Sequence, residues 1–388
     1  MKKITSLLLC LTIAMTLILL PAGAYAQAES GQAAAFDELD LYITIGIHQK
    51  TEGIKPFSVL PKQITPLYDL DGNMFAYYVE MDDGSYMVVN ANRENPSLLE
   101  FGSEGYNNVN QLAKTSNSGK LVYCGPGGFL TVKTAGSGTS KIYTNGETEV
   151  TAQDKTQINK FYDFCAEPNI HKKNALQETR GAIGLNGNQW SIFDLIKYED
   201  ELPAGDFYPE NIIYYDIVTY GTTGYFGTLT ALDGSTIYNH CGATSAYNIV
   251  SYYRYRLSDP IPYDQMGSTF LVIHSYMRNG PFTPSEYHQR IKSYIENETN
   301  YSIILTDPAE TWEAYKAEVR ANRMCFMCII PINVFEAHYI NGIGYREYHD
   351  GSKYARVIDN WHHEKGKKLH RYYIFGAGLF QIGGVYIY

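Results

Sequence analysis

The N-terminal half of the chain follows a hydrophobic period of two. Between about residues 37 and 100, apolar and polar side chains alternate, and short turn sequences interrupt the alternation. Alternation bounded by Asp-Gly and Gly-Asn turns predicts an antiparallel meander. The predicted strands and turns are Leu67–Leu70, Asp71-Gly72-Asn73, Met74–Met81, Asp83-Gly84 and Tyr86–Asn90. A second strand-like group continues to Val150, so this half is predicted to be β-rich.

Clear helix signals appear only in the C-terminal half. Thr283-Pro284-Ser285-Glu286 is a capping box with proline at the first helical position, where a backbone N–H is not needed. The apolar face expected behind it consists of Tyr287, Ile291, Tyr294 and Ile295. Asp307-Pro308-Ala309-Glu310 repeats this pattern before a second apolar face at Trp312, Tyr315 and Val319. Both segments are predicted to begin helices.

Strand patterns dominate after these helices. The predicted strands are Met324–Ile332, His338–Tyr345, Tyr354–Ile358 and Tyr372 to the end. Helices followed by an antiparallel sheet indicate an α+β domain. The predicted organisation is a segment to be removed at 1–26, a β-rich accessory domain or prodomain at 27–165, a linker or processing region at 166–206, and an α+β domain at 207–388.

The first residues indicate export. Met1-Lys2-Lys3 is positively charged, Ile4–Leu20 is apolar, and Ala24-Tyr25-Ala26 is a small-residue cleavage site. These features predict a secretory signal peptide cleaved after Ala26 and therefore a secreted protein. A retained membrane anchor is the alternative, but the apolar run is short for a bilayer span, and no later stretch is long and apolar enough.

Charge and cysteine content exclude several function classes. The net charge of −10 argues against a nucleic-acid surface. Cys124, Cys165, Cys241, Cys325 and Cys328 lie beyond the signal segment, and their odd number leaves at least one free thiol. Cys325 and Cys328 fall in an apolar strand, where an offset of three places them on opposite faces, roughly 10 Å apart at about 3.3 Å per residue. That geometry excludes a disulfide or a shared metal, so both are predicted to be core residues.

Cys241 is the candidate nucleophile. It follows a turn, and apolar residues at i, i+3, i+4 and i+7 begin directly after it, namely Ala246, Ile249, Val250 and Tyr253. A cysteine at a helix N-terminus is stabilised as the thiolate by unpaired N–H groups and the helix dipole. The alternative is that Cys241 is a small hydrophobic residue filling a helix start.

His338 and Asp359 are the candidate base and orienting group. His338 begins a predicted strand, and Asp359 ends the next one. Tyr348-His349-Asp350-Gly351 predicts a hairpin turn that pairs positions whose numbers sum to about 699–701, so one bulge brings His338 beside Asp359 or Asn360. A cysteine nucleophile requires a base of this kind, held by a third group. His362-His363 could form a metal pair, but consecutive histidines on an extended segment face opposite sides and no third ligand has suitable spacing.

At these motifs the sequence resembles a known family. Cys-Gly-Ala-Thr-Ser-Ala-Tyr-Asn, His-Tyr-Ile-Asn-Gly-Ile-Gly-Tyr and Val-Ile-Asp-Asn-Trp resemble papain-like cysteine peptidases, in particular the bacterial branch related to double-glycine (bacteriocin-processing) peptidases. This resemblance covers about residues 208–388. It implies that Cys241 is the nucleophile, His338 the general base and Asp359 the orienting group, with Asn360 as the rival and Trp361 as a shield against water.

One position departs from that family, and the N-terminal half adds a further resemblance. The family's usual Gln six residues before the nucleophile is Ser235 here, so Asn239 is the candidate side-chain donor to the oxyanion, beside the Cys241 backbone N–H. Pro66-Leu67-Tyr68-Asp69-Leu70 and Gly84-Ser85-Tyr86-Met87-Val88-Val89-Asn90 resemble the inhibitory prodomain of streptopain-type peptidases.

The sequence therefore predicts a secreted cysteine-type peptidase that forms an acyl-enzyme and is made as a zymogen. Its expected partners are a peptide or protein substrate and its own N-terminal domain as an inhibitor, with no nucleic acid and no membrane span in the mature chain. The mechanism requires no metal or organic cofactor. Two alternatives remain: an amidase acting on cell-wall peptides or an acyl transferase, and a weakly active or inactive papain-like module that binds or adheres.

Overall fold

A computed structural model gives the fold of most of the chain after residue 60. The structure describes residues 61–92, 97–103, 105–106, 109–116, 119–134, 141–144, 150–168, 196–201, 229–237, 240–254, 256–257, 266–279, 283–306, 309–329, 338–348, 351–359, 371–376 and 380–388. The predicted signal peptide, Asn239, Asn360, Trp361 and His362-His363 lie outside these ranges.

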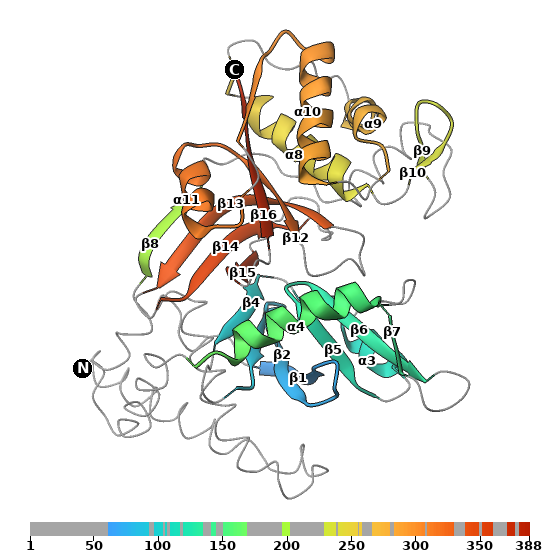
Figure 1. The fold of residues 1–388 in the computed structure, drawn as a ribbon, viewed down its shortest axis with the longest axis vertical. Helices are drawn as coiled ribbons and strands as arrows, with labels where there is room; N and C mark the ends of the chain where they lie inside the picture. The colour runs from blue at the N-terminus through green and yellow to red at the C-terminus, as the bar shows by residue number, and fades with distance from the viewer. Residues whose placement is uncertain are drawn as a thin grey trace, which may run out of the picture. The chain divides into compact units, whose positions relative to one another are not determined.

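The described secondary structure is rich in strands (Figure 1). The strands are β1 Pro61–Tyr68, β2 Met74–Met81, β3 Tyr86–Asn90, β4 Leu98–Gly102, β5 Leu121–Gly125, β6 Gly128–Thr134, β7 Lys141–Thr144, β8 Ile196–Glu201, β9 Leu229–Thr230, β10 Thr236–Ile237, β11 Ile303–Leu305, β12 Cys325–Ile329, β13 His338–Tyr348, β14 Lys353–Ile358, β15 Arg371–Ile374 and β16 Phe380–Ile387. The helices are α3 Val109–Thr115, α4 Ala152–Ala166, α8 Cys241–Arg254, α9 Met266–Met277, α10 Pro284–Glu298 and α11 Trp312–Arg320.

Most of these strands belong to one sheet. Fourteen strands join, and the main path runs β11-β16-β12-β13-β14-β15-β4-β3-β2-β1-β5-β6-β7, with β8 paired to the second half of β13. The sheet is mixed, because β1 pairs with β5 in parallel, whereas the other pairs along the path are antiparallel. β9 and β10 form a separate hairpin.

This architecture contradicts the predicted fold class. The expectation was a papain-like α+β domain at 207–388 preceded by a separate β-rich domain, and that expectation is wrong. The sheet continues through both regions, because β15 pairs with β4 in the register Arg371↔Gly102, Tyr372↔Phe101 and Tyr373↔Glu100 (Figure 1). β8, from the region expected to be a linker, also joins the sheet. Without this pairing, β4 and β15 would each be an edge strand of its own half. Local sequence patterns contain no signal for a pairing between strands so far apart in the chain.

The predicted meander is confirmed as β1, β2 and β3. Gly72 and Gly84 occupy the turns with φ of 89° and 84°, a left-handed conformation that favours glycine. Both faces of these strands contain buried side chains: Leu67 and Ala76 lie on one face, and Val79 and Met87 lie on the other. The first strand is Pro61–Tyr68 rather than Leu67–Leu70, so the turn sequences were predicted more accurately than the start of the meander.

The two predicted helix starts had different outcomes. Thr283 caps α10 through a complete capping box with Glu286, and the helix buries the predicted face. α11 begins later than predicted, because Thr311 is its N-cap and accepts from the Ala314 N–H, while Ala309 forms a bridge with Ile382. No helix within the described ranges is long and apolar enough to cross a membrane.

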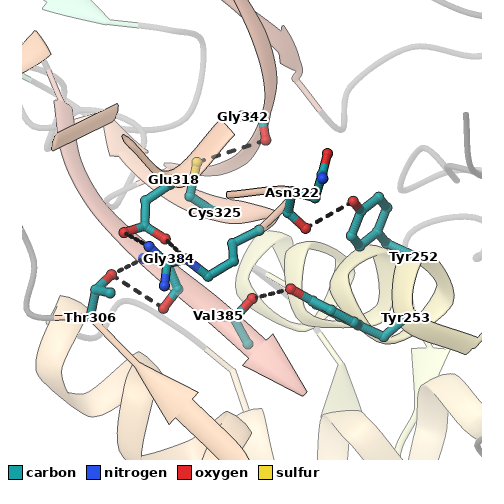
Figure 2. Close-up of polar contacts among 10 residues, drawn as sticks. Tyr252, Tyr253, Thr306, Glu318, Asn322, Cys325, Gly342, Gly384 and Val385 are labelled. Atoms are coloured by element: carbon teal, nitrogen blue, oxygen red, sulfur yellow. Dashed lines mark hydrogen bonds and ion pairs between the residues drawn. The ribbon is translucent and has the colours of Figure 1, made fainter. Parts of the chain in front are cut away.

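The C-terminal end of α8 is fastened to the sheet by polar contacts (Figure 2). The hydroxyl of Tyr252 donates a hydrogen bond of 3.0 Å to the Asn322 carbonyl, and that of Tyr253 donates one of 2.6 Å to the Val385 carbonyl. Beside them the Glu318 carboxylate of α11 packs against Gly384 of β16 and pairs with Arg323 at 2.7 Å. A Cβ atom at Gly384 would overlap the Glu318 carboxylate, so a larger residue there would have to displace that side chain.

Candidate functional site

Cys241 is the first residue of α8. The helix begins with the Thr244 N–H bonded to the His240 carbonyl at 2.9 Å, so Cys241 lies in the first turn, where backbone N–H groups have no partner within the helix. The side chain is 9% exposed and belongs to the core cluster around α8. The ring of His240 packs edge-on against Phe270 of α9.

A buried polar cluster holds α8 on β13. The Asn341 amide of β13 donates to the Ser245 carbonyl at 3.1 Å and to Ser245 Oγ at 3.0 Å. The Tyr287 hydroxyl of α10 donates to the same Ser245 Oγ at 3.0 Å. Ser245, Asn341 and Tyr287 are each fully buried. This Ser245 cluster joins the helix that begins at Cys241 to the strand that begins at His338.

Contacts along α8 place Cys241 toward the start of β13. Ser245 contacts Asn341, whereas Tyr253, two turns later, donates to the Val385 carbonyl. Val385 is bonded to Met324, which precedes the Cys325↔Gly342 pair and lies away from the Ile329↔His338 pair. The helix therefore runs in the same direction as β13, and both begin at the same end of their contact.

The His338 ring has a defined hydrogen bond. Its Nε2 lies 2.7 Å from the backbone carbonyl oxygen of Asp359, and the residue is 4% exposed. A carbonyl oxygen only accepts, so Nε2 is the protonated nitrogen in this bond. In the neutral ring Nδ1 is then the unprotonated, basic nitrogen.

The Asp359 carboxylate has a different partner. Its Oδ2 lies 2.7 Å from Arg371 Nε, and both side chains are 2% exposed. Sequence reasoning expected this carboxylate to orient His338, but the ring donates to the Asp359 main-chain carbonyl. Strand alternation explains why the carboxylate meets Arg371, because Asp359 is two residues beyond Val357, which pairs with Arg371 and shares its face of the sheet.

Alternation also decides how His338 relates to α8. Asn341 faces α8, whereas a Cβ atom at Gly342 would lie 2.5 Å from the Tyr315 ring, so Gly342 faces α11. Four residues separate Gly342 from His338 along β13, which gives the two residues the same face. A contact between the imidazole and Cys241 therefore has to pass around the end of β13, where His338 is the first residue.

Arg371 is the residue of this region that sequence reasoning missed. Its guanidinium is 1% exposed, donates to the Tyr86 hydroxyl at 2.6 Å, and lies over the rings of Tyr86 and Tyr106. Nearby Glu100 is fully buried, and its burial raises the pKa to about 8, although Arg371 and the Gly127 N–H lower it. An arginine that begins a Tyr-Tyr strand carries no pattern that separates it from an exposed strand end, so no sequence signal distinguished it.

The remaining cysteines are buried free thiols, as Cys241 is, but none of them begins a helix. Cys325 and Cys328 are buried free thiols of β12, which confirms their predicted core role. Burial raises the pKa of Cys328 to about 12 and that of Cys325 further. Cys124 and Cys165 are likewise buried, with pKa values raised by burial. These four thiols are protonated at neutral pH and are poor nucleophiles.

Comparison with known proteins adds no family to these observations. No protein-family model matches the sequence, and no curated protein is significantly similar to it. Within the described residues, no group of three or more His, Cys, Asp or Glu side chains could hold a metal ion.

Proposed function

We propose that the protein is a cysteine-type peptidase in which Cys241 is the nucleophile and His338 the general base. Support comes from the first turn of α8, which favours a thiolate at Cys241, and from the Ser245 cluster, which fastens that helix to β13. Neither feature is required of a cysteine that only fills a core.

The observation that carries the proposal is the bond from His338 Nε2 to the Asp359 carbonyl. A base that must accept a proton from a thiol needs a fixed tautomer, with one nitrogen held as a donor and the other left as an acceptor. The 2.7 Å bond fixes the Nε2–H tautomer, and the proposal assigns acceptance of the thiol proton to Nδ1. A carbonyl also stabilises the imidazolium that forms once Nδ1 takes the proton.

The reaction follows from these roles. His338 Nδ1 takes the Cys241 proton, and the thiolate attacks the carbonyl carbon of a peptide bond. The Cys241 backbone N–H stabilises the resulting oxyanion, and Asn239 is the expected second donor. His338 then protonates the leaving amine, and the acyl-enzyme forms. A water molecule deprotonated by His338 attacks the thioester, which releases the acid and restores the thiol.

Selective labelling of Cys241 tests the proposal. The full chain, without its first 26 residues, is treated with iodoacetamide at pH 6, and each cysteine peptide is quantified by mass spectrometry. An ordinary thiol with a pKa of about 8.5 is almost fully protonated at this pH, so fast labelling requires an ion pair. We expect Cys241 to react fast, and His338→Ala to lower its rate by at least about 10²-fold.

The four other cysteines, Cys124, Cys165, Cys325 and Cys328, are internal controls. Cys328 and its buried neighbours should remain unlabelled in folded protein, because burial keeps their thiols protonated. Equal labelling of Cys241 in the wild type and in His338→Ala would refute the pairing and favour a binding module. If the pairing holds, hydrolysis of an unfolded protein rather than of cell-wall peptides separates a general peptidase from an amidase.

A further inference from the structure

Arg371 lies where the two halves of the sheet meet. It begins β15, between β14 and β4, and its side chain is buried. Burial of a guanidinium is costly unless its charge and its N–H groups find partners. The charge is paired with the Asp359 carboxylate, Nη1 donates to the Tyr86 hydroxyl, and two tyrosine rings lie against the guanidinium. Among the described residues, Nε and Nη2 have no hydrogen-bond partner.

Asp359 connects Arg371 to His338. The carboxylate of Asp359 pairs with Arg371 Nε at 2.7 Å, and its carbonyl accepts from His338 Nε2 at 2.7 Å. The last ladder pair of β13 and β14 is Asn341↔Ile358, so Asp359 lies just beyond the strand pairing. The ion pair therefore supplies a constraint on the Asp359 main chain at the point where the ladder ends.

The N-terminal strands hold Arg371 from the other side. Tyr86 belongs to β3, and its hydroxyl accepts from Arg371 Nη1 at 2.6 Å. The Arg371 guanidinium lies 4.1 Å from the centre of the Tyr106 ring, and the Tyr106 hydroxyl lies 3.1 Å from that of Tyr373. Beside them Phe101 of β4 stacks on Tyr372 of β15 with ring centres 4.7 Å apart.

We propose that Arg371 is a positioning residue for His338, and that β3 and β4 are part of the catalytic unit because they hold Arg371. The proposal rests on the proposed function, since it concerns the same base. Arg371 fixes Asp359, and Asp359 fixes the imidazole and its tautomer. Under this arrangement the N-terminal strands support the base, which is the opposite of the inhibitory role that the sequence suggested.

Two substitutions in the full-length protein test the contacts that connect Tyr86, Arg371 and Asp359 with His338. Arg371→Lys keeps the positive charge but loses the flat guanidinium, which pairs with Asp359 through Nε and donates to Tyr86 through Nη1. Tyr86→Phe removes only the hydroxyl that accepts from Arg371, so it preserves the buried ring. Arg346→Lys is the matched control, because Arg346 is also buried in the sheet, packs on Tyr372, and lies opposite Tyr354 near the far end of β14.

The first readout is the His338 ring itself. Two-bond ¹H–¹⁵N spectra distinguish the Nε2–H tautomer from its alternative, and the His338→Ala spectrum identifies the His338 signals. We expect the wild type and Arg346→Lys to keep Nε2 protonated throughout the neutral range, both in the neutral ring and in the imidazolium of the ion pair. Arg371→Lys and Tyr86→Phe should show a mixture of tautomers and a shifted midpoint of titration.

The second readout is the pH profile of Cys241 labelling. We expect Arg371→Lys to slow labelling at pH 6 by about 10²-fold, the usual loss when a distant change misplaces a catalytic group. Tyr86→Phe should slow it by about tenfold, because one charge-assisted hydrogen bond is lost. In both variants the rise in rate should move to higher pH, which loss of stability alone would not produce.

The outcomes separate the two proposals. Wild-type labelling that does not depend on His338 refutes the proposed function, and the ring spectra still show whether Arg371 positions His338. An unchanged tautomer and an unchanged profile in folded Arg371→Lys overturn the role of Arg371, and Tyr86→Phe decides the question if Arg371→Lys does not fold. Faster labelling in Tyr86→Phe would also overturn it, because an inhibitory N-terminal half predicts that result.

Discussion

Replacement of Asn341 by alanine probes the contact between the proposed nucleophile and base. The Asn341 amide makes hydrogen bonds of 3.1 and 3.0 Å to the Ser245 carbonyl and hydroxyl, in a fully buried environment. Both bonds cross from β13 to α8. Asn341→Ala removes them without altering either element's own backbone pairing.

The expected loss of stability follows from these two bonds. A buried hydrogen bond contributes about 1 kcal/mol net, and the truncated amide leaves a small cavity, so the free energy of unfolding should fall by about 2–3 kcal/mol. The loss is limited because Ser245 Oγ still accepts from the Tyr287 hydroxyl. A folded domain with about 5–15 kcal/mol of stability tolerates such a change.

Urea unfolding of Asn341→Ala, Ser245→Ala and the double variant measures this loss. If the residues interact as described, the double variant should be more stable than the sum of single effects predicts, by about 1 kcal/mol. Asn248→Ala extends the series, because the Asn248 amide lies 3.5 Å from Asn341 Oδ1 on the same helix. Additive single effects of Asn341→Ala and Ser245→Ala would refute the contact described between α8 and β13.

Two further substitutions test the sheet around the site. Gly342→Ala should lower the free energy of unfolding by about 1–3 kcal/mol in urea titrations, because its Cβ would lie 2.5 Å from the Tyr315 ring and 2.9 Å from Cys325 Sγ; wild-type stability would contradict this packing. Burial raises the pKa of Glu100 from 4.5 to about 8, so the folded protein binds that proton more tightly than the unfolded chain. Stability from this group is complete below pH 4.5 and should fall by about 1 kcal/mol per unit as the pH rises toward 8; Glu100→Gln should flatten that slope, and an unchanged slope would show that Glu100 is not its source.

The hairpin that connects His338 with Asp359 was predictable from local chemistry. The turn at Tyr348–Gly351 implied pairs summing to about 699–701, and the observed pairs Asn341↔Ile358 and Tyr345↔Ala355 obey that rule. A register shift between Gly342 and Gly344 also matches the bulge that the prediction required. Turn type and strand period are properties of neighbouring residues, so a single sequence contains them.

The partner of the Asp359 carboxylate was not predictable in this way. Sequence reasoning placed the acid beside His338 but could not determine which of its oxygens faces the ring. That choice depends on the face of the sheet to which Asp359 belongs and on Arg371 of β15 lying next to it. Arg371 in turn is buried only because β4 pairs with β15, a contact between residues about 270 positions apart. Such a pairing depends on how two sheet edges fit together, which no local period records.

The shared sheet changes what removal of the N-terminal half would do. A removable inhibitor should leave behind a catalytic part whose buried charges remain satisfied, but loss of β3 and β4 would take the Tyr86 hydroxyl from Arg371 and expose the paired edge of β15. The Arg371–Asp359 pair would then be open to water, where an ion pair stabilises far less. Because the Asp359 carbonyl holds His338, weakening that pair should loosen the base. If the protein is processed, we therefore expect a cut outside the paired strands, after which both parts remain associated through β4 and β15.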